Sequence, residues 1–258
     1  MCRRWNGNGD GGSEAQLKIQ IVCEVGRDVI DKVLNTVDEA VADLRDGALI
    51  MISGFGPPGQ PGDLIESIIR KGIGDLVVIN NNAGAGGDAI RELFALERVR
   101  KVICSFPRAL DSTVFDDLYL AGKIELELVP QGTLAERIRA GGAGIGGFFT
   151  KTSYGTELAR GKETKIIDGH GYVLELPLTA DFALIKAYVA DPHGNLIFRK
   201  TGRNFGPVMA TAARCTVVEV DEIRELGSLD PEQIVTPGIY VDRVVCVGKR
   251  SLPNGDGR

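Results

Sequence analysis

The segment from Ala48 to Gly72, with the sequence ALIMISGFGPPGQPGDLIESIIRKG, constrains the fold of this chain more than any other. Its first five residues are apolar and have the length of a buried strand, and glycines and prolines follow at once. Beyond that turn, apolar residues recur with the spacing of one helical face, at Ile65, Ile68 and Ile69. The sequence therefore predicts a strand, a tight turn and a helix, the first step of a βαβ unit.

The turn itself allows three interpretations. Residues 54–59, GFGPPG, match the glycine spacing of a dinucleotide-binding fingerprint. A phosphate site of that kind uses backbone N–H groups, which Pro57 and Pro58 lack. The acid expected about 20 residues later, at the end of the next strand, is also misplaced, because Asp75 precedes the strand. In the second interpretation, the glycines simply allow a sharp turn between strand and helix. In the third, the turn brings its backbone against an acyl substrate, and the sequence favours this third interpretation.

The order of strand, turn and helix repeats through the first half of the chain. Apolar or alternating runs predict further strands at Leu76–Ile79, Val102–Cys104 and Ile124–Val129. Apolar residues at helical spacing mark the helix between the first two, namely Ile90, Leu93, Phe94 and Leu96. Such alternation predicts a parallel sheet, in which ligands bind beyond the carboxyl ends of the strands.

Two T-x-x-E patterns predict capping boxes at helix starts. Thr36 with Glu39 precedes a short apolar run that leads toward the first strand. Thr133 with Glu136 precedes the helical sequence LAERIRA, which two glycines close. The residues just before this second pattern, 130–132, are expected to form a turn at the carboxyl edge of the sheet.

The second half predicts hairpins and further strands. A D-G-H-G turn separates Lys165–Ile167 from Tyr172–Leu174, and a D-P-H-G-N turn separates two longer apolar runs. The remaining strands are expected at Phe182–Val189, Leu196–Phe198, Cys215–Val220 and Tyr240–Val247. We therefore predict an α/β fold with an open, mainly parallel sheet, flanking helices and antiparallel additions in the C-terminal half. One domain is expected over residues 30–248, with a disordered extension at 1–29 and a flexible tail at 249–258.

Composition excludes several classes of function. The net charge of -5 provides no basic patch of the kind that nucleic-acid binding needs. The five cysteines are scattered and, with two histidines, form no credible zinc set, so no metal site is expected. No apolar run reaches the length of a membrane span and no secretory signal is present, so we expect a cytoplasmic protein that meets no membrane.

Several blocks of the sequence resemble one family. Residues 46–61, DGALIMISGFGPPGQP, resemble the first signature of the family I coenzyme A transferases. The likeness continues through INNNAG at 79–84 and ELVPQGTLAERIRAGGAGI at 127–145, and spans roughly residues 30–247. The block PQGTLAERIRAGGAG resembles the A subunit of the 3-oxoacid CoA-transferases in particular.

This resemblance implies that CoA moves from succinyl-CoA to a 3-oxoacid, with acetoacetate and 3-oxoadipate both open as acceptors. It implies no permanently bound cofactor, since the coenzyme A thioester is a substrate. The nucleophilic glutamate of the family belongs to an S-E-N-G motif in a separate B subunit, and that motif is absent here. A heterodimer or an α2β2 assembly is expected. The alternatives are a relative acting on another acyl-CoA, as transferase or thioesterase, and a non-catalytic binding subunit.

The resemblance also assigns site residues. Gln131, Asn81 and Asn82 match positions that line the family's active site, and amide groups donate hydrogen bonds without titrating. The two asparagines could equally stabilise their own turn. Gly54, Phe55 and Gly59 are expected to form a wall of the substrate site, by the same resemblance.

Two stretches depart from the family pattern near the expected site. Where the family usually has S-Y-V-G-E-N, Ser105 and Phe106 are followed by PRALDSTVF, which is slightly longer. Where it has G-L-G after N-N-A-G, residues 89–91 read AIR. We expect the cation of Arg108, in the longer loop, to bind the second carboxylate of a dicarboxylic acceptor.

Overall fold

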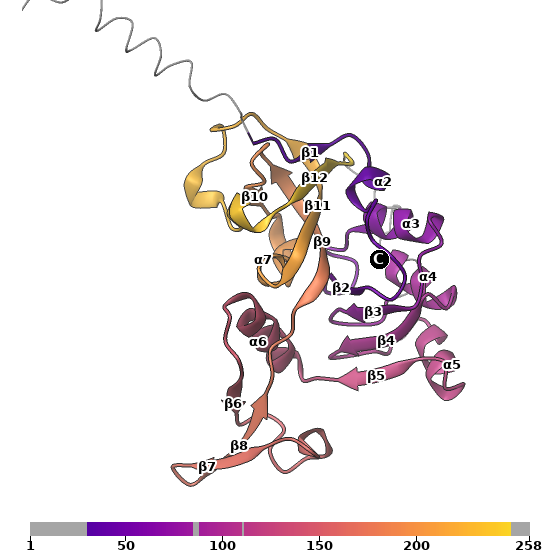
Figure 1. The fold of residues 1–258 in the computed structure, drawn as a ribbon, viewed down its shortest axis with the longest axis vertical. Helices are drawn as coiled ribbons and strands as arrows, with labels where there is room; N and C mark the ends of the chain where they lie inside the picture. The colour runs from indigo at the N-terminus through magenta and orange to yellow at the C-terminus, as the bar shows by residue number, and fades with distance from the viewer. Residues whose placement is uncertain (1–29, 85–87, 110, 249–258) are drawn as a thin grey trace, which may run out of the picture. The chain divides into compact units, whose positions relative to one another are not determined.

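The computed structural model describes residues 30–84, 88–109 and 111–248. The described residues between Lys32 and Gly248 belong to a single compact unit, drawn in Figure 1. The predicted extension at 1–29 and the predicted tail at 249–258 lie outside the described residues, so these boundaries stay a prediction.

A nine-stranded sheet organises this unit. Its order is β1 (Val33–Leu34), β12 (Arg243–Cys246), β11 (Ala213–Ile223), β9 (Ala180–Ala190), β2 (Leu49–Ile52), β3 (Leu76–Ile79), β4 (Val99–Cys104) and β5 (Glu125–Leu128). Every neighbouring pair in this order is parallel. The ninth strand, β10 (Leu196–Ile197), pairs with β9 in the antiparallel direction. The predicted mainly parallel α/β fold is confirmed.

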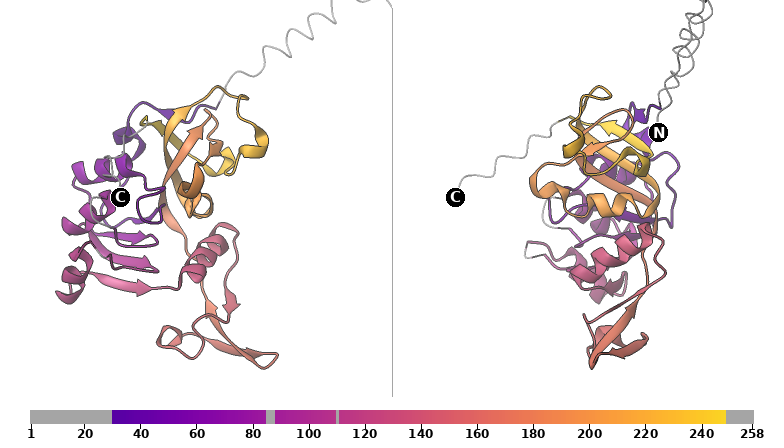
Figure 2. Two further views of the ribbon diagram at one scale, coloured as in Figure 1. Left: turned by 180° about the vertical axis from the view of Figure 1, so that it is seen from behind. Right: turned by 90° about the vertical axis from the view of Figure 1, so that its left-hand side faces the viewer.

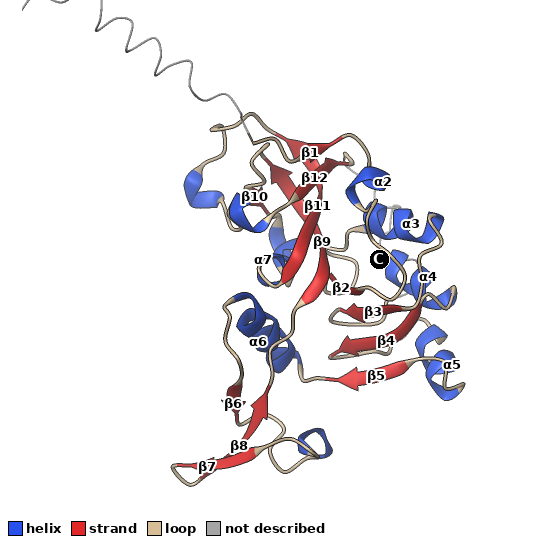
Figure 3. Ribbon diagram, viewed as in Figure 1, coloured by secondary structure: helices blue, strands red, loops and turns tan. Residues whose placement is uncertain are grey.

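A second sheet is small and antiparallel. It has the order β6 (Phe148–Thr150), β8 (His170–Glu175) and β7 (Thr164–Ile167), and Figures 1 and 3 show it beyond α6 and apart from the main sheet. Ile167 pairs with His170, so Asp168 and Gly169 form the hairpin turn, with φ of 49° and 75°. The predicted hairpin is confirmed, and its positive φ values suit the Asp-Gly sequence.

Helices cover both faces of the main sheet (Figure 2). One face carries α2 (Val37–Ala40), α3 (Gly62–Arg70), α4 (Ala89–Ala95) and α5 (Val114–Leu120). The other carries α6 (Gln131–Gly142) and α7 (Gly206–Ala210). Short 3-10 helices are η1 (Glu157–Ala159), η2 (Lys200–Arg203), η3 (Pro231–Gln233) and η4 (Gly238–Tyr240).

Strand β2 shows how the two cores arise. Ile50 and Ile52 are fully buried against the helices of the first face, whereas Met51 between them is buried against the second. Side chains alternate between the faces of a strand, so a wholly apolar strand has to be covered on both sides. This is why the continuous apolar runs of β2 and β3 predict their central place in the sheet.

No described helix has the length and apolarity to cross a bilayer.

The first predicted capping box is confirmed and the second is wrong. Thr36 Oγ1 accepts from Glu39 N at 3.2 Å, and the Glu39 carboxylate accepts from Thr36 N at 3.3 Å. At the second site, α6 begins at Gln131, so Thr133 is its third residue and is buried. Glu136 instead forms a bidentate ion pair with Arg139. Residues 131–132 are therefore the start of a helix and not the expected turn.

Helices α5 and α7 and the short strands β1 and β6 were not predicted, and strands β4, β9 and β11 are longer than expected. α5 follows the divergent loop, and α7 follows η2. Strand β4 begins at Val99, ahead of the predicted Val102, and the charged pair Arg100 and Lys101 interrupts its apolar pattern. Lys101 pairs across to the neighbouring strand, so charges on this strand are compatible with the sheet.

Candidate active site

A cavity of about 460 Å³ lies where four neighbouring strands end. It is lined by Phe55, Gly56, Asn81, Asn82, Ser105, Phe106 and Gln131. These residues follow β2, β3 and β4 or begin α6 directly after β5. The carboxyl edge of the sheet is where ligands bind in open α/β folds, so the topology and the cavity agree.

Asn81 is the centre of a hydrogen-bond network in this cavity. Its side-chain oxygen Oδ1 accepts from Ser105 Oγ at 2.8 Å and from Gln131 Nε2 at 2.7 Å. Both lone pairs of Oδ1 are thereby used, which fixes the orientation of the amide group. Among the described residues its Nδ2 has no hydrogen-bond partner, so this N–H₂ group remains able to donate to a ligand.

The neighbouring Asn80, which the sequence analysis did not single out, holds the turn in place. It is fully buried, donates from Nδ2 to Ile52 O at 2.6 Å, and accepts from Asn82 N at its Oδ1 at 2.8 Å. The turn is therefore stabilised by Asn80, which leaves the side chains of Asn81 and Asn82 for other contacts. Asn82 Oδ1 is buried and has no partner in the described part of the chain.

The lining of the cavity is neutral and partly aromatic. Phe55 and Phe106 are 53% and 64% exposed, and none of the seven lining residues carries a charge. Exposed aromatic side chains are enriched at protein interfaces. Neutral amides beside exposed rings suit the binding of an acyl group and the docking of another chain, but the lining offers no carboxylate nucleophile.

The glycine-rich turn after β2 is held by side chains on both sides. Ser53 Oγ donates to Gly59 O at 2.6 Å and accepts from Lys186 N at 3.1 Å. Gly59 has a φ of 81°, and a Cβ atom there would lie 2.5 Å from the carbonyl oxygen of Gly202. Of the predicted wall residues, Phe55 lines the cavity, whereas Gly54 and Gly59 give the turn its shape.

Asn204 also contacts this turn, and sequence reasoning missed it. Its Oδ1 accepts from Gly54 N at 3.1 Å and its Nδ2 donates to Pro58 O at 2.9 Å. The partners lie 150 and 146 residues away in the sequence, so no local pattern could indicate the contact.

Arg108 lies outside the residues that line the cavity. Its side chain is 74% exposed, and its Nε donates to Asp116 Oδ1 at 2.8 Å. An exposed ion pair contributes little free energy, about 0–1 kcal/mol. The role expected for Arg108 stays a prediction that requires another group to cover this side chain.

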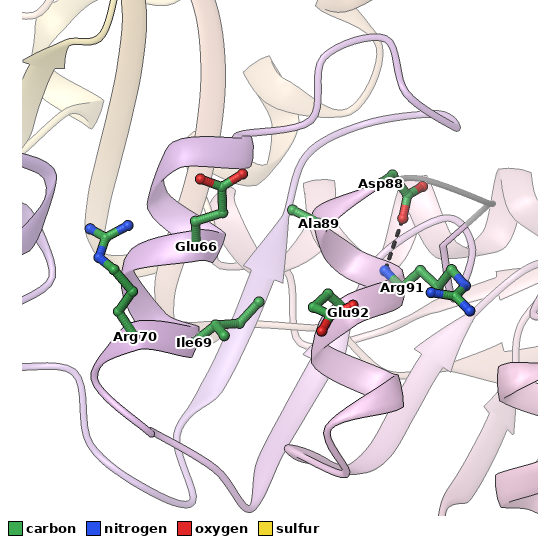
Figure 4. A pocket seen from close by; sticks show the side chains of 7 residues that line it. All are labelled: Glu66, Ile69, Arg70, Asp88, Ala89, Arg91 and Glu92. Atoms are coloured by element: carbon green, nitrogen blue, oxygen red, sulfur yellow. Dashed lines mark hydrogen bonds between the residues drawn. The ribbon is translucent and has the colours of Figure 1, made fainter.

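A second cavity of about 400 Å³ lies between α3 and α4 and contains none of the predicted site residues (Figure 4). Its lining is of mixed charge: Glu66, Ile69, Arg70, Asp88, Ala89, Arg91 and Glu92. Asp88 caps α4 by accepting from Arg91 N at 2.8 Å. The divergent residues 89–91 therefore form the first turn of α4 and lie away from the amide network.

A network of charged side chains anchors α6, which carries Gln131. The side chain of Arg137 is only 10% exposed, and it donates to Glu127 Oε1 at 2.9 Å and to Leu176 O at 2.7 Å. Glu175, almost fully buried, accepts from Lys162 at 2.6 Å and lies 3.8 Å from Arg137. These contacts join α6 to β5 and to the small sheet, and thereby fix the helix start at the cavity.

Ion pairs and burial determine the pKa values of the side chains in and near this network. Burial alone raises the pKa of the Glu127 carboxyl, but hydrogen bonds from Arg137 and Lys101 outweigh it and hold that pKa below its usual value. Beside the cavity, burial raises the pKa of the Cys104 thiol to about 12. A thiol with so high a pKa stays protonated near neutral pH and is a poor nucleophile. The described residues contain no group of three or more His, Cys, Asp or Glu side chains that could hold a metal ion.

Comparison with known proteins identifies one family. The family model described as Coenzyme A transferase matches residues 34–247. The chain is 58% identical over 219 residues to the A subunit of 3-oxoadipate CoA-transferase from Pseudomonas putida, covering 85% of this chain and 95% of the relative. It is 52% identical over 220 residues to the A subunit of succinyl-CoA:3-ketoacid coenzyme A transferase from Xanthomonas campestris, covering 83% of this chain and 90% of the relative.

A solved structure shows the same fold. The crystal structure of glutaconate coenzyme A-transferase from Acidaminococcus fermentans superposes with a TM-score of 0.73 at 25% sequence identity. The match covers 84% of this chain and 76% of the other. The similarity therefore extends over most of this chain and is not limited to one motif.

Proposed function

The chain belongs to the coenzyme A transferase family, and from this membership we propose that it is the A subunit of a two-chain 3-oxoacid CoA-transferase. The observation that carries the proposal is the neutral amide cavity at the carboxyl edge of the sheet. It offers hydrogen-bond donors for acyl transfer and its lining contains no carboxylate, which suits one half of an enzyme whose other half supplies a carboxylate.

For the substrates, we propose succinyl-CoA as donor and 3-oxoadipate as acceptor. In support, the relative named for 3-oxoadipate is 58% identical, whereas the relative named for a 3-ketoacid is 52% identical. A difference this small supports a preference, so acetoacetate is the competitor to measure beside 3-oxoadipate. The CoA thioester acts as substrate in this proposal, and the protein needs no resident cofactor.

In the reaction, the thioester carbonyl is attacked by a glutamate of the partner B subunit, and a tetrahedral oxyanion forms. Collapse expels CoA thiolate and leaves a mixed anhydride between the acyl group and the glutamate. The thiolate then attacks the glutamyl carbonyl, which breaks the anhydride to give an enzyme–CoA thioester and the free donor carboxylate. The acceptor carboxylate reverses these steps. The role of this chain is to donate hydrogen bonds to the oxyanions from the neutral amides of Asn81, Asn82 and Gln131.

Arg108 is the proposed contact for the second carboxylate of a dicarboxylic acceptor. Its guanidinium pairs with Asp116 at 2.8 Å and remains largely exposed, so a bound partner chain has to reduce its exposure for the contact to matter. The exposed rings of Phe55 and Phe106 support docking of such a chain nearby. We propose a cytoplasmic heterodimer or α2β2 assembly.

The test is to purify this chain alone, the B subunit from a neighbouring reading frame alone, and the two together. Transfer of CoA from succinyl-CoA to 3-oxoadipate is then followed for each. We expect transfer by the complex only, because the described cavity contains no carboxylate. Transfer by the single chain would refute the division of roles. Release of free CoA by the complex without an acceptor would indicate a thioesterase, and binding without turnover would indicate a non-catalytic subunit.

A further inference from the structure

We propose that Asn204 is a positioning residue that fixes the substrate-facing turn, residues 53–60, from a distant part of the chain. This inference rests on the proposed transferase function. The residue follows η2 and lies against the turn without lining the cavity itself. It therefore acts through the turn and does not touch the reacting atoms.

The carboxamide of Asn204 holds the turn at both ends with opposite hydrogen-bond polarity. Its Oδ1 accepts from Gly54 N at 3.1 Å, before the cavity-lining residues Phe55 and Gly56. Its Nδ2 donates to Pro58 O at 2.9 Å, after them. A single side chain thus fixes the backbone on either side of the two residues that face the cavity. A side-chain amide is neutral and carries its acceptor and its donors on separate atoms, so it can bind two groups of opposite polarity at once.

The same carboxamide is itself fixed by its own segment. Nδ2 also donates to Thr201 O at 2.9 Å, and Oδ1 also accepts from Phe205 N at 2.6 Å. Phe205 is buried in the second core, so the frame that carries Asn204 is anchored in the sheet. The close approach of Gly59 to Gly202 provides a second contact between the same two segments.

Two features of the turn depend on its position relative to the cavity. The ring of Phe55 forms one side of the cavity, and the backbone N–H of Gly56 has no hydrogen-bond partner among the described residues. A free N–H beside the amides of Asn81 and Gln131 is able to donate to an oxyanion. A displacement of about 1 Å in a positioned group is enough to reduce turnover about 10²-fold.

The experiment uses the complex of this chain with its B subunit, in which Asn204→Ala and Asn204→Asp are compared with wild type. Steady-state kinetics use succinyl-CoA and 3-oxoadipate, and amide hydrogen exchange is followed in peptides covering residues 53–60. For Asn204→Ala we expect kcat to fall by at least about tenfold and exchange at Gly54 to increase. Asn204→Asp keeps the acceptor for Gly54 N and loses the donor to Pro58 O, so an intermediate kcat with Gly54 still protected is expected.

Asn195→Ala is the matched control. Asn195 also links two segments, because its Nδ2 donates to Asp191 at 2.8 Å and its Oδ1 accepts from Gly238 N at 2.8 Å, but it does not contact the cavity turn. A control that loses similar thermal stability and keeps kcat separates positioning from general destabilisation.

The outcomes separate the two proposals. The inference would be overturned if Asn204→Ala increased hydrogen exchange in residues 53–60 but kept kcat within about twofold of wild type, a difference under half a kcal/mol. Unchanged hydrogen exchange in residues 53–60 would also overturn it. If Asn204→Ala fails to fold, Asn204→Asp decides by its kcat alone, and a kcat within about twofold of wild type for that variant would overturn the inference. If the wild-type complex does not transfer CoA, the proposed function fails, and hydrogen exchange in the folded chain still decides whether Asn204 fixes the turn.

Discussion

Replacing Gln131 by alanine in the assembled enzyme tests the amide network most directly. One N–H of Gln131 donates to Asn81 Oδ1 at 2.7 Å, and its second N–H has no acceptor within the described part of the chain and can donate to a ligand. Gln131 is exposed and begins α6, so the substitution leaves no cavity in the core and should preserve the fold. We expect kcat to fall by about 10²-fold or more, the usual effect of losing one oxyanion donor, which is about 2.7–4 kcal/mol.

The size of the loss distinguishes two roles of this side chain. If Gln131 merely orients Asn81, its removal costs one neutral hydrogen bond, about 0.5–1.5 kcal/mol. That corresponds to a decrease in kcat of roughly tenfold or less. If it also donates to the oxyanion, the larger loss applies. A double-mutant cycle with Asn81→Ala separates the shared hydrogen bond from the direct effect, and we expect the two losses to be less than additive.

The assay is single-turnover and steady-state CoA transfer by the complex, with thermal unfolding measured for each variant. Gln233→Ala is a suitable control, because that amide donates to the exposed Asp230 at 3.2 Å and does not line the cavity. A kcat for Gln131→Ala within about tenfold of wild type, about 1.4 kcal/mol or less, would mean that Gln131 donates no hydrogen bond to the oxyanion and would refute the reasoning.

Two further predictions concern charge. The pKa of Glu127 is lowered in the folded chain, so its ion pairs should contribute stability above the usual glutamate range, about pH 4.3, and lose it as pH falls through the lowered pKa. Urea unfolding of Glu127→Gln at neutral and acid pH should therefore show lower stability at pH 7 and a weaker decline with acid, whereas the more exposed Glu125→Gln should behave like wild type. For Arg108→Ala, we expect kcat/KM for 3-oxoadipate to fall relative to acetoacetate, and a ratio that changes by less than about twofold would make Arg108 a surface residue.

The sequence was most informative where the pattern was local. The apolar runs of β2 and β3 predict buried parallel strands because both faces of each strand have to be covered. The T-x-x-E pattern at Thr36 succeeded because Thr36 stands directly before α2, where its hydroxyl accepts from Glu39 N. At Thr133 the same pattern failed, because the hydroxyl is buried within α6 and Glu136 pairs with Arg139.

Contacts between distant segments were beyond the reach of local patterns. Gln131, Asn81 and Asn82 could be placed together because the ends of adjacent parallel strands share an edge. Asn204 could not be placed with its partners, because the sequence around Asn204 contains no pattern that points to the distant turn after β2. Asn80 was overlooked for another reason: three consecutive asparagines look alike in sequence, and only the buried hydrogen bond to Ile52 O distinguishes the structural one.

The order of strands in the main sheet has a consequence for synthesis of the chain. β2 pairs with β3 on one side and with β9 on the other, and the contact of Leu49 N with Asp181 joins residues 132 apart. While the ribosome completes that interval, one edge of β2 exposes unpaired backbone groups beside apolar side chains, a template for aggregation. At about 5–20 residues per second, the delay is roughly 7–26 s. A nascent chain in this state is a natural client for chaperones that bind extended apolar segments.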